Sequence, residues 1–306
     1  MSKVAIGIIG GGEILDAHAP ALAHNSDRCE VRCIAEKRTD PQTVSRIRTL
    51  LVHRKRCTRE TLEVMTREIE MCAATGWHEL RAVLGGVEER FGPDARWREH
   101  RQSCIELLKA VAPVLKANQC RINLEDHGDL STFELVEIVE DVGPDVVGVN
   151  LDTANVLLFA EDPVMAAGRV APYTHLTHAK DGILFFTDGG VTRQGRPPGG
   201  GVVDWPGVLE VLAEHNPEMP ISIEDHKWLF EVKIFENAWH EAHGRVSTYE
   251  LSQFVRLAAE GSRKLMTGEL PDAAQYESIP FVEQMGDRLS QGRTYLQGLV
   301  AELGLR

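Results

Sequence analysis

Short apolar runs alternate with longer amphipathic segments along the chain. The runs are rich in Val, Ile and Leu and predict strands, whereas apolar residues repeated every three to four positions predict helices between them. Strands are expected at 4–10, 29–35, 49–54, 78–85, 121–125, 146–152, 174–178 and 220–224. Helices are expected at 13–25, 41–48, 59–75, 96–118, 131–142, 161–170 and 204–215. Eight strands in alternation with helices predict an α/β fold, the (βα)₈ TIM barrel.

Residues that start and stop helices support these boundaries. Thr58 is expected to cap the helix at 59–75 and Gly76 to end it. Ser131 and Gly143 are expected to do the same for the helix at 131–142.

The chain continues beyond the eighth predicted strand with two more helices, at 247–266 and 281–303. We therefore expect a barrel over residues 1–230 and a C-terminal helical extension over 231–306, which covers the barrel or forms an oligomer contact. The stretch 182–203 contains the Gly/Pro-rich sequence RQGRPPGGG and is expected to be a long loop.

Length and composition fit this fold. A chain of 306 residues accommodates one barrel of about 250 residues with extensions. The net charge of −13 argues against a nucleic-acid partner and, more weakly, against highly anionic substrates. No run reaches the ~18 apolar residues of a membrane helix, and MSKVAIGIIGG is expected to be a first strand, not a signal peptide.

The cysteines point to a reducing compartment. All six lie before residue 121 and no C-x-x-C pair occurs, so reduced thiols in a cytoplasmic protein are expected. Cys29 and Cys33 are four positions apart, but no nearby His or Cys completes a zinc set.

The last four predicted strands each end in an ionisable residue. Side chains alternate along a strand, so in VVGVNLD the apolar set faces the helices and Asp152 faces the axis. The same alternation points Glu125, His178 and Glu224 inward, and the two glutamates stand in the repeated triplet Glu-Asp-His. These residues are expected at the C-terminal face of the barrel, where barrel active sites lie.

Three carboxylates around one axis repel each other unless a cation neutralises them. Three oxygen ligands and one imidazole suit one divalent metal ion, Mn²⁺ or Mg²⁺, with Co²⁺ and Zn²⁺ as alternatives. We expect Mn²⁺, and we expect metal loss to abolish activity.

The motifs NLEDH, VGVNLDTAN, HLTHAKD and PPGGGVVDW…ISIEDH resemble the sugar isomerase/epimerase branch of the xylose isomerase-like barrels, over roughly residues 59–230. The resemblance implies that Glu125, Asp152, His178 and Glu224 bind one divalent metal. It also implies that Glu125 and Glu224 are the catalytic acid/base pair, on opposite faces of a sugar or sugar derivative. The implied reaction is isomerisation or epimerisation by proton removal next to a carbonyl.

Further residues near these motifs are candidates for substrate contacts. Each also has a structural interpretation: Lys180 as a surface ion pair, His226 as a structural histidine, and Trp228 as a core or interface residue. The expected substrate-binding residues are Asn155, Lys180, Asp181, His226 and Trp228. A homo-oligomer is expected, with a second subunit as an alternative partner.

Related barrels suggest other reactions. In carbon-glycoside deglycosidases a similar metal site and a histidine eliminate the aglycone from a 3-oxo-sugar, and His127 would be that catalytic base here. Apurinic-site endonucleases need further ligand histidines, but this chain has Asn155 at one such position and no histidine at 182–203. A sugar-binding protein without catalysis is the remaining alternative.

The N-terminus resembles a different family. KVAIGIIGGGEILDAHAPAL followed by CEVRCIAEK is similar to the start of NAD(P)-dependent sugar oxidoreductases of the Gfo/Idh/MocA type. Gly10 and Gly12 would approach a pyrophosphate and Glu36 a ribose hydroxyl. However, Leu15 occupies the third glycine position, and only about forty residues match, too few for a dinucleotide domain.

Overall fold

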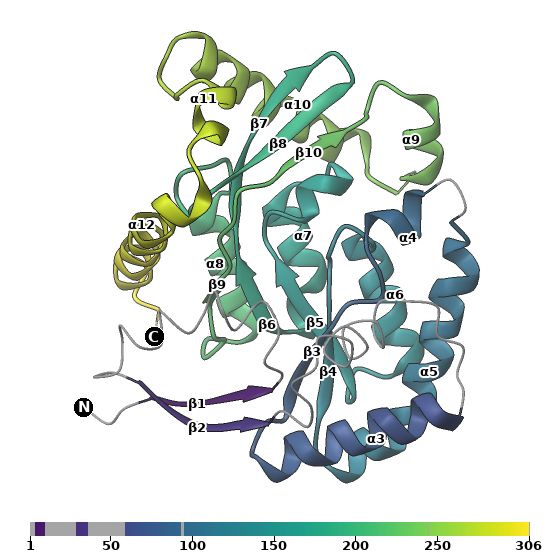
Figure 1. Cartoon of the computed structure of the whole chain (residues 1–306). Helices are drawn as coiled ribbons and strands as arrows, with labels where there is room; N and C mark the ends of the chain where they lie inside the picture. The colour runs from purple at the N-terminus through teal and green to yellow at the C-terminus, as the bar shows by residue number, and fades with distance from the viewer. Residues whose placement is uncertain (1–3, 10–28, 36–58, 93–94, 244, 306) are drawn as a thin grey trace. The chain divides into compact units, whose positions relative to one another are not determined.

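The computed structural model describes residues 4–9, 29–35, 59–92, 95–243 and 245–305 (Figure 1). The chain divides into two compact units, Met1–Lys55 and Arg56–Arg306. In the first unit, β1 (Val4–Ile9) and β2 (Cys29–Ala35) form a parallel pair at the positions of the first two predicted strands. The third predicted strand, 49–54, and the predicted helices 13–25 and 41–48 lie outside the described residues.

The second unit is built on a curled parallel sheet. Its strand order is β3-β4-β5-β6-β9, which follows the order of these strands in the sequence, with β7 (Asp181–Thr187) and β8 (Gly190–Arg196) leaving the sheet between β6 and β9. The described part of the barrel is therefore a half-barrel. The strands are β3 (Glu79–Ala82), β4 (Arg121–Glu125), β5 (Val147–Asp152), β6 (Thr174–Ala179) and β9 (Ser222–Ile223).

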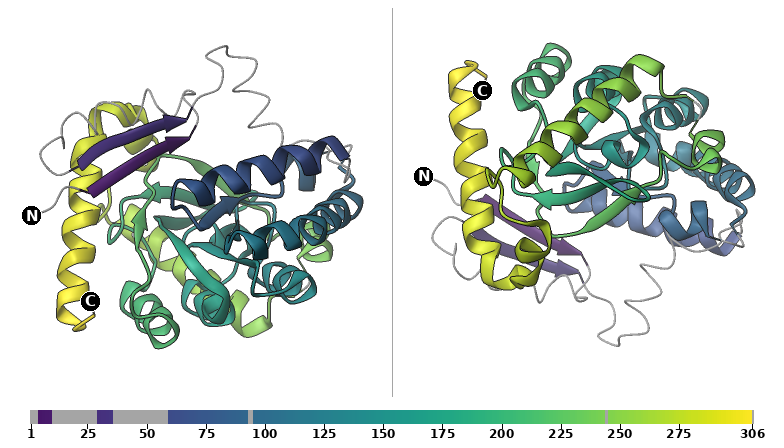
Figure 2. Two further views of the ribbon diagram at one scale, coloured as in Figure 1. Left: turned by 90° about the horizontal axis from the view of Figure 1, so that it is seen from below. Right: turned by 90° about the horizontal axis from the view of Figure 1, so that it is seen from above.

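Helices connect these strands and lie around the outside of the sheet (Figure 2). Helices that follow one another in the sequence pack side by side, as expected for right-handed βαβ crossovers. The main helices are α3 (Arg59–Ala74), α5 (Trp97–Ala117), α6 (Thr132–Val142), α7 (Pro163–Val170) and α8 (Trp205–His215). Shorter turns are α4 (Val87–Phe91), η1 (Val156–Phe159) and η2 (Ala171–Tyr173).

Strand β5 shows how the hydrophobic pattern determines the two faces of the sheet. Val147, Val149 and Leu151 are buried, as predicted for side chains that face the helices. The alternate positions Asn150 and Asp152 are buried as well, because the inner face of the half-barrel also excludes water. A polar side chain on that inner face needs a partner.

The predicted helix boundaries are confirmed wherever the structure describes them. Ser131 accepts from the Glu134 backbone N–H, and the Glu134 side chain accepts from the Ser131 N–H, which forms a capping box. Gly76, just beyond α3, has φ +84°, a conformation that favours glycine. Thr58 lies outside the described residues.

The stretch predicted as a long loop, 182–203, is instead mostly a β-hairpin. β7 (Asp181–Thr187) and β8 (Gly190–Arg196) pair antiparallel, and β10 (Leu229–Val232) pairs with β8 on its other side. The prediction was wrong because the polar residues of β8 obscure a strand pattern. Their burial comes from pairing with β10, more than thirty residues later.

The C-terminal part of the unit is helical. It contains α9 (Asn237–Ala242), α10 (Thr248–Met266), α11 (Ala273–Ser278) and α12 (Phe281–Glu302). The two long helices confirm the predictions at 247–266 and 281–303, while the domain boundary at residue 230 stays a prediction.

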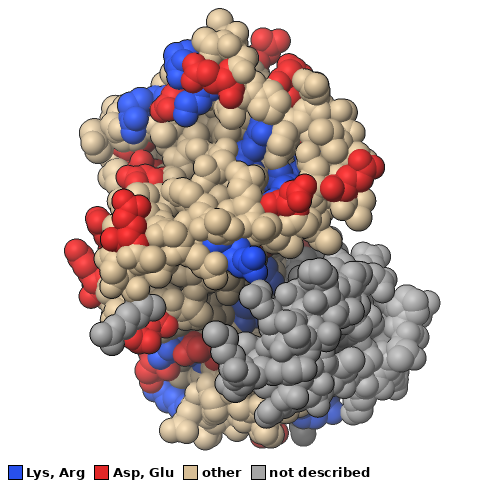
Figure 3. All heavy atoms as spheres, turned by 90° about the vertical axis from the view of Figure 1, so that its left-hand side faces the viewer, with Lys and Arg blue, Asp and Glu red and all other residues tan. Residues whose placement is uncertain are grey.

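Two features of the described residues concern membrane-spanning helices and the charge on one face of the surface. None of the described helices combines the length and the apolar character needed to cross a membrane. On the face shown in Figure 3, basic and acidic side chains are interspersed among the coloured residues.

Candidate metal centre

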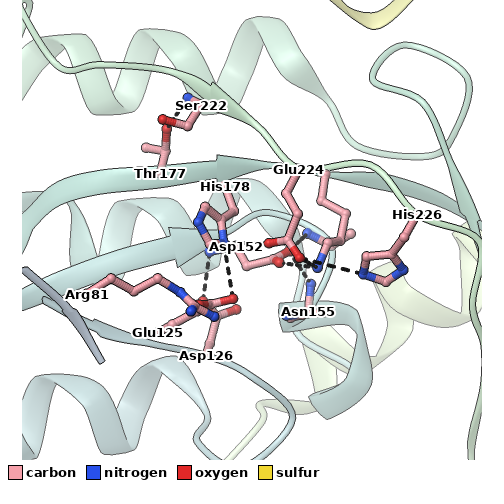
Figure 4. A network of polar contacts seen from close by, with 12 residues as sticks. Arg81, Glu125, Asp126, Asp152, Asn155, Thr177, His178, Ser222, Glu224 and His226 are labelled. Atoms are coloured by element: carbon pink, nitrogen blue, oxygen red, sulfur yellow. Dashed lines mark hydrogen bonds and ion pairs between the residues drawn. The ribbon is translucent and has the colours of Figure 1, made fainter. Parts of the chain in front are cut away.

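The four predicted metal ligands come from neighbouring strands of the parallel sheet. Glu125 ends β4, Asp152 ends β5, His178 lies near the end of β6, and Glu224 directly follows β9. Because the strands are parallel, these ends lie along one edge of the sheet, and the side chains point toward one another there (Figure 4).

The four side chains form a compact cluster. One potential ligand atom from each lies within 4.8 Å of the corresponding atoms of the other three. His178 Nδ1 is 3.1 Å from Glu125 Oε1 and 2.5 Å from Glu224 Oε2. Glu125 and Asp152 have no exposed surface, whereas the side chains of His178 and Glu224 are 20% and 31% exposed. The cluster therefore meets solvent on the Glu224 side.

Charge determines the protonation of the His178–glutamate group. Burial would lower the pKa of His178, but hydrogen bonding to Glu125 and Glu224 raises it to about 9. Burial would raise the pKa of Glu125, but the His178 hydrogen bond and the nearby Arg81 charge lower it to about 2. The pKa of Glu224 is also lowered, against burial, by His178 and Lys180. At neutral pH this arrangement holds two carboxylates around an imidazolium.

Lys180 supplies the second positive charge of the cluster. Its Nζ lies 2.6 Å from Asp152 Oδ2 and 3.3 Å from Glu224 Oε1, and its side chain is only 3% exposed. This buried position excludes the interpretation of Lys180 as a surface ion pair.

The donor set suits a divalent cation. Three carboxylates and one imidazole offer ligand atoms of the type and number that Mn²⁺, Mg²⁺ or Zn²⁺ uses. The carboxylates now face positive charge on His178 and Lys180. A cation bound to this set would replace the His178 proton, since only a neutral imidazole is a ligand. The residues present therefore fit a divalent metal ion.

Backbone amides and a second carboxylate fix Asp152. Its Oδ1 accepts from the backbone N–H groups of Ala154 and Asn155, each at 3.0 Å, which leaves Oδ2 turned toward Lys180. The Asp152 N–H donates to Asp126 Oδ1 at 2.8 Å. Through this hydrogen bond Asp126 supports Asp152 within the cluster. Burial and the Asp152 charge raise the pKa of Asp126.

Two of the remaining predicted residues, His226 and Trp228, lie beside the cluster. His226 Nε2 is 3.7 Å from Glu224 Oε1, and the His226 and Trp228 rings lie 6.2 Å apart. Burial and the Lys180 charge lower the pKa of His226 to about 4, so it is a neutral hydrogen-bonding group at pH 7.

The structure does not bring His127 into the cluster. This residue is exposed in the turn after β4, and its backbone N–H donates to Asp129 Oδ1 at 3.1 Å. The charge of His127 acts on His226, which adjoins Glu224, and the role of His127 as a catalytic base stays a prediction.

Asp181 is buried away from the cluster and supports the neighbouring chain. Its carboxylate accepts five hydrogen bonds, from the backbone N–H groups of residues 182, 199, 201 and 203 and from Trp205 Nε1. These donors use the available lone pairs, so the geometry favours a structural role for Asp181 over the predicted substrate contact.

Two arginines near the cluster were not predicted. Arg81, on β3, forms an ion pair with Glu125. Strand alternation could have predicted the inward direction of Arg81. β3 pairs with β4, and Arg81 lies opposite Asn123, whose side chain points inward like that of Glu125. Arg193, on β8, donates from Nη1 to Asn155 Oδ1 at 3.5 Å. No face was assigned to Arg193 because its strand was expected to be a loop.

The described cysteines are free thiols. Cys72, Cys104 and Cys120 form no disulfide, and burial raises the pKa of Cys104 to about 12. They agree with the expected reduced state, and the other cysteines lie outside the residues whose side chains the structure describes.

Several solved structures are similar to this chain. A xylose isomerase domain protein from Planctomyces limnophilus is 20% identical, with 87% of this chain and 89% of that one covered and a TM-score of 0.46. A xylose isomerase-like TIM barrel protein from Mycobacterium smegmatis, in complex with magnesium, is 16% identical, with coverages of 83% and 85% and a TM-score of 0.49. D-psicose 3-epimerase with D-tagatose from Clostridium cellulolyticum H10 is 15% identical, with coverages of 85% and 88% and a TM-score of 0.47.

The family assignment comes from the sequence. None of the curated proteins compared with this chain matches it, and the N-terminal resemblance to Gfo/Idh/MocA oxidoreductases is not supported. Gly10, Gly12 and Glu36 also lie outside the described residues. A sequence model described as the xylose isomerase-like TIM barrel matches residues 38–242 of the 306. The chain therefore belongs to the xylose isomerase-like TIM barrel family.

Proposed function

We propose that this protein is a sugar isomerase or epimerase that depends on one divalent metal ion. The observation that carries the proposal is the convergence of Glu125, Asp152, His178 and Glu224, with ligand atoms within 4.8 Å of one another. Membership of the xylose isomerase-like family supports it. The substrate is a sugar or sugar derivative with a carbonyl group.

The four residues would hold the ion, and of the candidate metals we propose Mn²⁺. Oxygen donors dominate the set, and one imidazole completes it. When bound, the ion supplies positive charge that stabilises the negative charge developing on the substrate's carbonyl oxygen.

The glutamates move the proton. Glu125 and Glu224 are both ionised at neutral pH and lie on either side of His178 (Figure 4). One carboxylate removes the proton from the carbon next to the carbonyl, and the electron pair of that C–H bond moves toward the carbonyl. The other carboxylate first takes up a proton from solvent and then returns it to the intermediate. Return to the same carbon from the opposite face restores the carbonyl and gives epimerisation. Return to the former carbonyl carbon gives isomerisation, in which the proton of the neighbouring hydroxyl also moves to the former carbonyl oxygen, so that the neighbouring carbon becomes the new carbonyl.

Neighbouring side chains orient the reacting groups. Lys180 and Arg81 balance the carboxylate charges, and both contact ligands of the cluster. His226 is neutral at pH 7 and adjoins Glu224, so it is placed to hydrogen-bond a substrate hydroxyl.

The test combines metal analysis with isotope exchange. Purified protein is analysed for metals, stripped with a chelator and reloaded with Mn²⁺, and each form is incubated with a panel of ketoses and 3-oxo-glycosides in deuterium oxide. We expect the loaded protein to introduce deuterium next to the carbonyl and the stripped protein to lose this activity. Exchange that survives complete removal of metal would contradict the proposal. Release of an aglycone without any exchanged or isomerised sugar would indicate the elimination reaction instead.

A further inference from the structure

Arg193 is a buried cation without a dedicated anionic partner. It lies in the middle of β8 and has no exposed surface. Its Nε and Nη2 atoms have no hydrogen-bond partner among the described residues, and its Nη1 reaches only Asn155 Oδ1, at 3.5 Å. A buried guanidinium in this state has lost water and gained only one long hydrogen bond, which is unfavourable unless a ligand supplies the others.

The strand geometry directs Arg193 toward the candidate metal centre. Side chains alternate along β8, so Arg193 points away from Gln194 and Arg196. Those two residues contact each other, and Gln194 donates to Ala273 and Glu277 of the C-terminal part. On the opposite side, Arg193 donates to the Asn155 side chain. The backbone N–H of Asn155 in turn donates to Asp152 of the cluster.

The nearby carboxylates are occupied by other groups. The acidic residues whose charge acts on Arg193 are Asp152 and Glu224. Asp152 contacts Lys180, and Glu224 contacts His178 and Lys180. A divalent cation at the cluster would add two positive charges and displace the His178 proton, a net gain of one. The site as a whole therefore has an excess of positive charge that a substrate anion would balance.

Trp228 and Asn155 fix the orientation of the guanidinium. The Arg193 Cζ lies 5.4 Å from the centroid of the Trp228 ring, which is 40% exposed, and Asn155 accepts from Nη1. The unpartnered edge, Nε with Nη2, is the pair of parallel N–H donors that matches the two oxygens of a carboxylate.

We propose that Arg193 binds a carboxylate group of the substrate, so that this protein acts on an acidic sugar in preference to a neutral ketose. The inference rests on the proposed function, because that function places a substrate at this cluster. Recognition of the carboxylate depends on Arg193 alone. A single carboxylate fits better than a phosphate group, because one guanidinium edge offers two donors and the protein carries a net charge of −13.

The test uses pairs of ligands that do not react. An aldonate and its alditol have the same stereochemistry and differ in one group, a carboxylate in place of CH₂OH. We would measure by calorimetry how tightly each ligand binds the Mn²⁺-loaded protein. Three pairs are compared: D-gluconate and D-glucitol, D-galactonate and D-galactitol, and D-mannonate and D-mannitol. We expect at least one aldonate to bind about tenfold to a hundredfold more tightly than its alditol, the range typical of charge-assisted hydrogen bonds.

Variants separate Arg193 from the metal, which also attracts carboxylates. Arg193→Gln should remove most of the aldonate preference while metal content stays at the wild-type level. Arg196→Gln, on the opposite face of the same strand, is the matched control and should keep the preference. Arg193→Lys retains the charge without the paired donors, and its affinity for the aldonate should fall by about tenfold. This variant replaces Arg193→Gln in the test if Arg193→Gln does not fold.

The outcomes distinguish this inference from the proposed function. A full aldonate preference in Arg193→Gln or Arg193→Lys, equal binding of aldonates and alditols by the wild type, or no aldonate binding would each overturn the inference. Deuterium exchange is measured separately on ketoses and their acidic counterparts. Exchange on neutral ketoses at rates equal to the acids would leave the function standing and reject the role of Arg193. An Arg193-dependent aldonate preference without any exchange would leave the carboxylate site standing and reject the function.

Discussion

Nδ1 of His178 lies 2.5 Å from Oε2 of Glu224, on the same nitrogen that approaches Glu125. One imidazole nitrogen thus faces two carboxylates of the set that would hold a metal ion. The two glutamates raise the pKa of His178 to about 9 even though burial acts to lower it. Proton and metal ion therefore compete for this site.

Metal affinity is expected to rise with pH. A ligand histidine must lose its proton, so below pH 9 the apparent affinity for Mn²⁺ should fall by about tenfold per pH unit. Each ion bound near pH 7.5 should release about one proton. Calorimetry in two buffers of different ionisation enthalpy measures this number directly. Binding without proton release would show that His178 is not a ligand.

The metal-free protein is expected to lose stability above neutral pH. The folded-state pKa of His178, about 9, lies above its ordinary value of 6.5, so its stabilising effect is complete below pH 6.5. That contribution is lost as the pH rises from 6.5 to about 9 and amounts to about 3 kcal/mol. Urea unfolding of the chelator-treated protein across this range measures the change. His178→Asn is the control, and the same pH slope in that variant would assign the effect to another group.

Replacing either glutamate with glutamine tests the proton-transfer roles. Glu125→Gln and Glu224→Gln keep a ligand oxygen and the shape of the side chain, but they remove the proton acceptor. Turnover should fall by about 10²- to 10⁴-fold, with metal still bound. Asp152→Asn should instead weaken metal binding, because Asp152 has no proton to move. Metal content and deuterium exchange are measured on the same preparations.

Two results would contradict these roles. Near wild-type turnover in both glutamine variants, with metal bound, would restrict Glu125 and Glu224 to coordination. A larger loss in His127→Ala than in either glutamine variant would favour elimination by a histidine base. We expect His127→Ala to change turnover only slightly, because His127 is exposed and outside the cluster.

Asp181→Ala is expected to destabilise the fold. The substitution leaves five buried or partly buried donors around residues 182–205 without an acceptor. The free energy of unfolding should fall by about 2 to 4 kcal/mol. Asp188→Ala, in the exposed turn of the same hairpin, is the matched control and should change it by less than about 0.5 kcal/mol. Equal effects of the two substitutions on chemical denaturation would reject the anchoring role of Asp181.

Local patterns in the sequence were enough to predict the strands and helices of the half-barrel and the direction of Glu125, Asp152, His178 and Glu224. Alternation along a strand has a period of two, so each short run already specifies which residues share a face. Parallel strands that pair in their order along the sequence then bring those residues to one edge of the sheet. For this reason the four side chains converge as the sequence predicted.

Only the tertiary structure decided the partners of Arg81, Asp181 and Arg193. Arg193 is buried because β8 pairs with both β7 and β10, and Asp181 is saturated because the chain after β8 folds back over its carboxylate. Both arrangements depend on residues distant in the sequence. Short-range periodicity contains no information about such pairings, since the burial and charge of a side chain depend on every element packed against it.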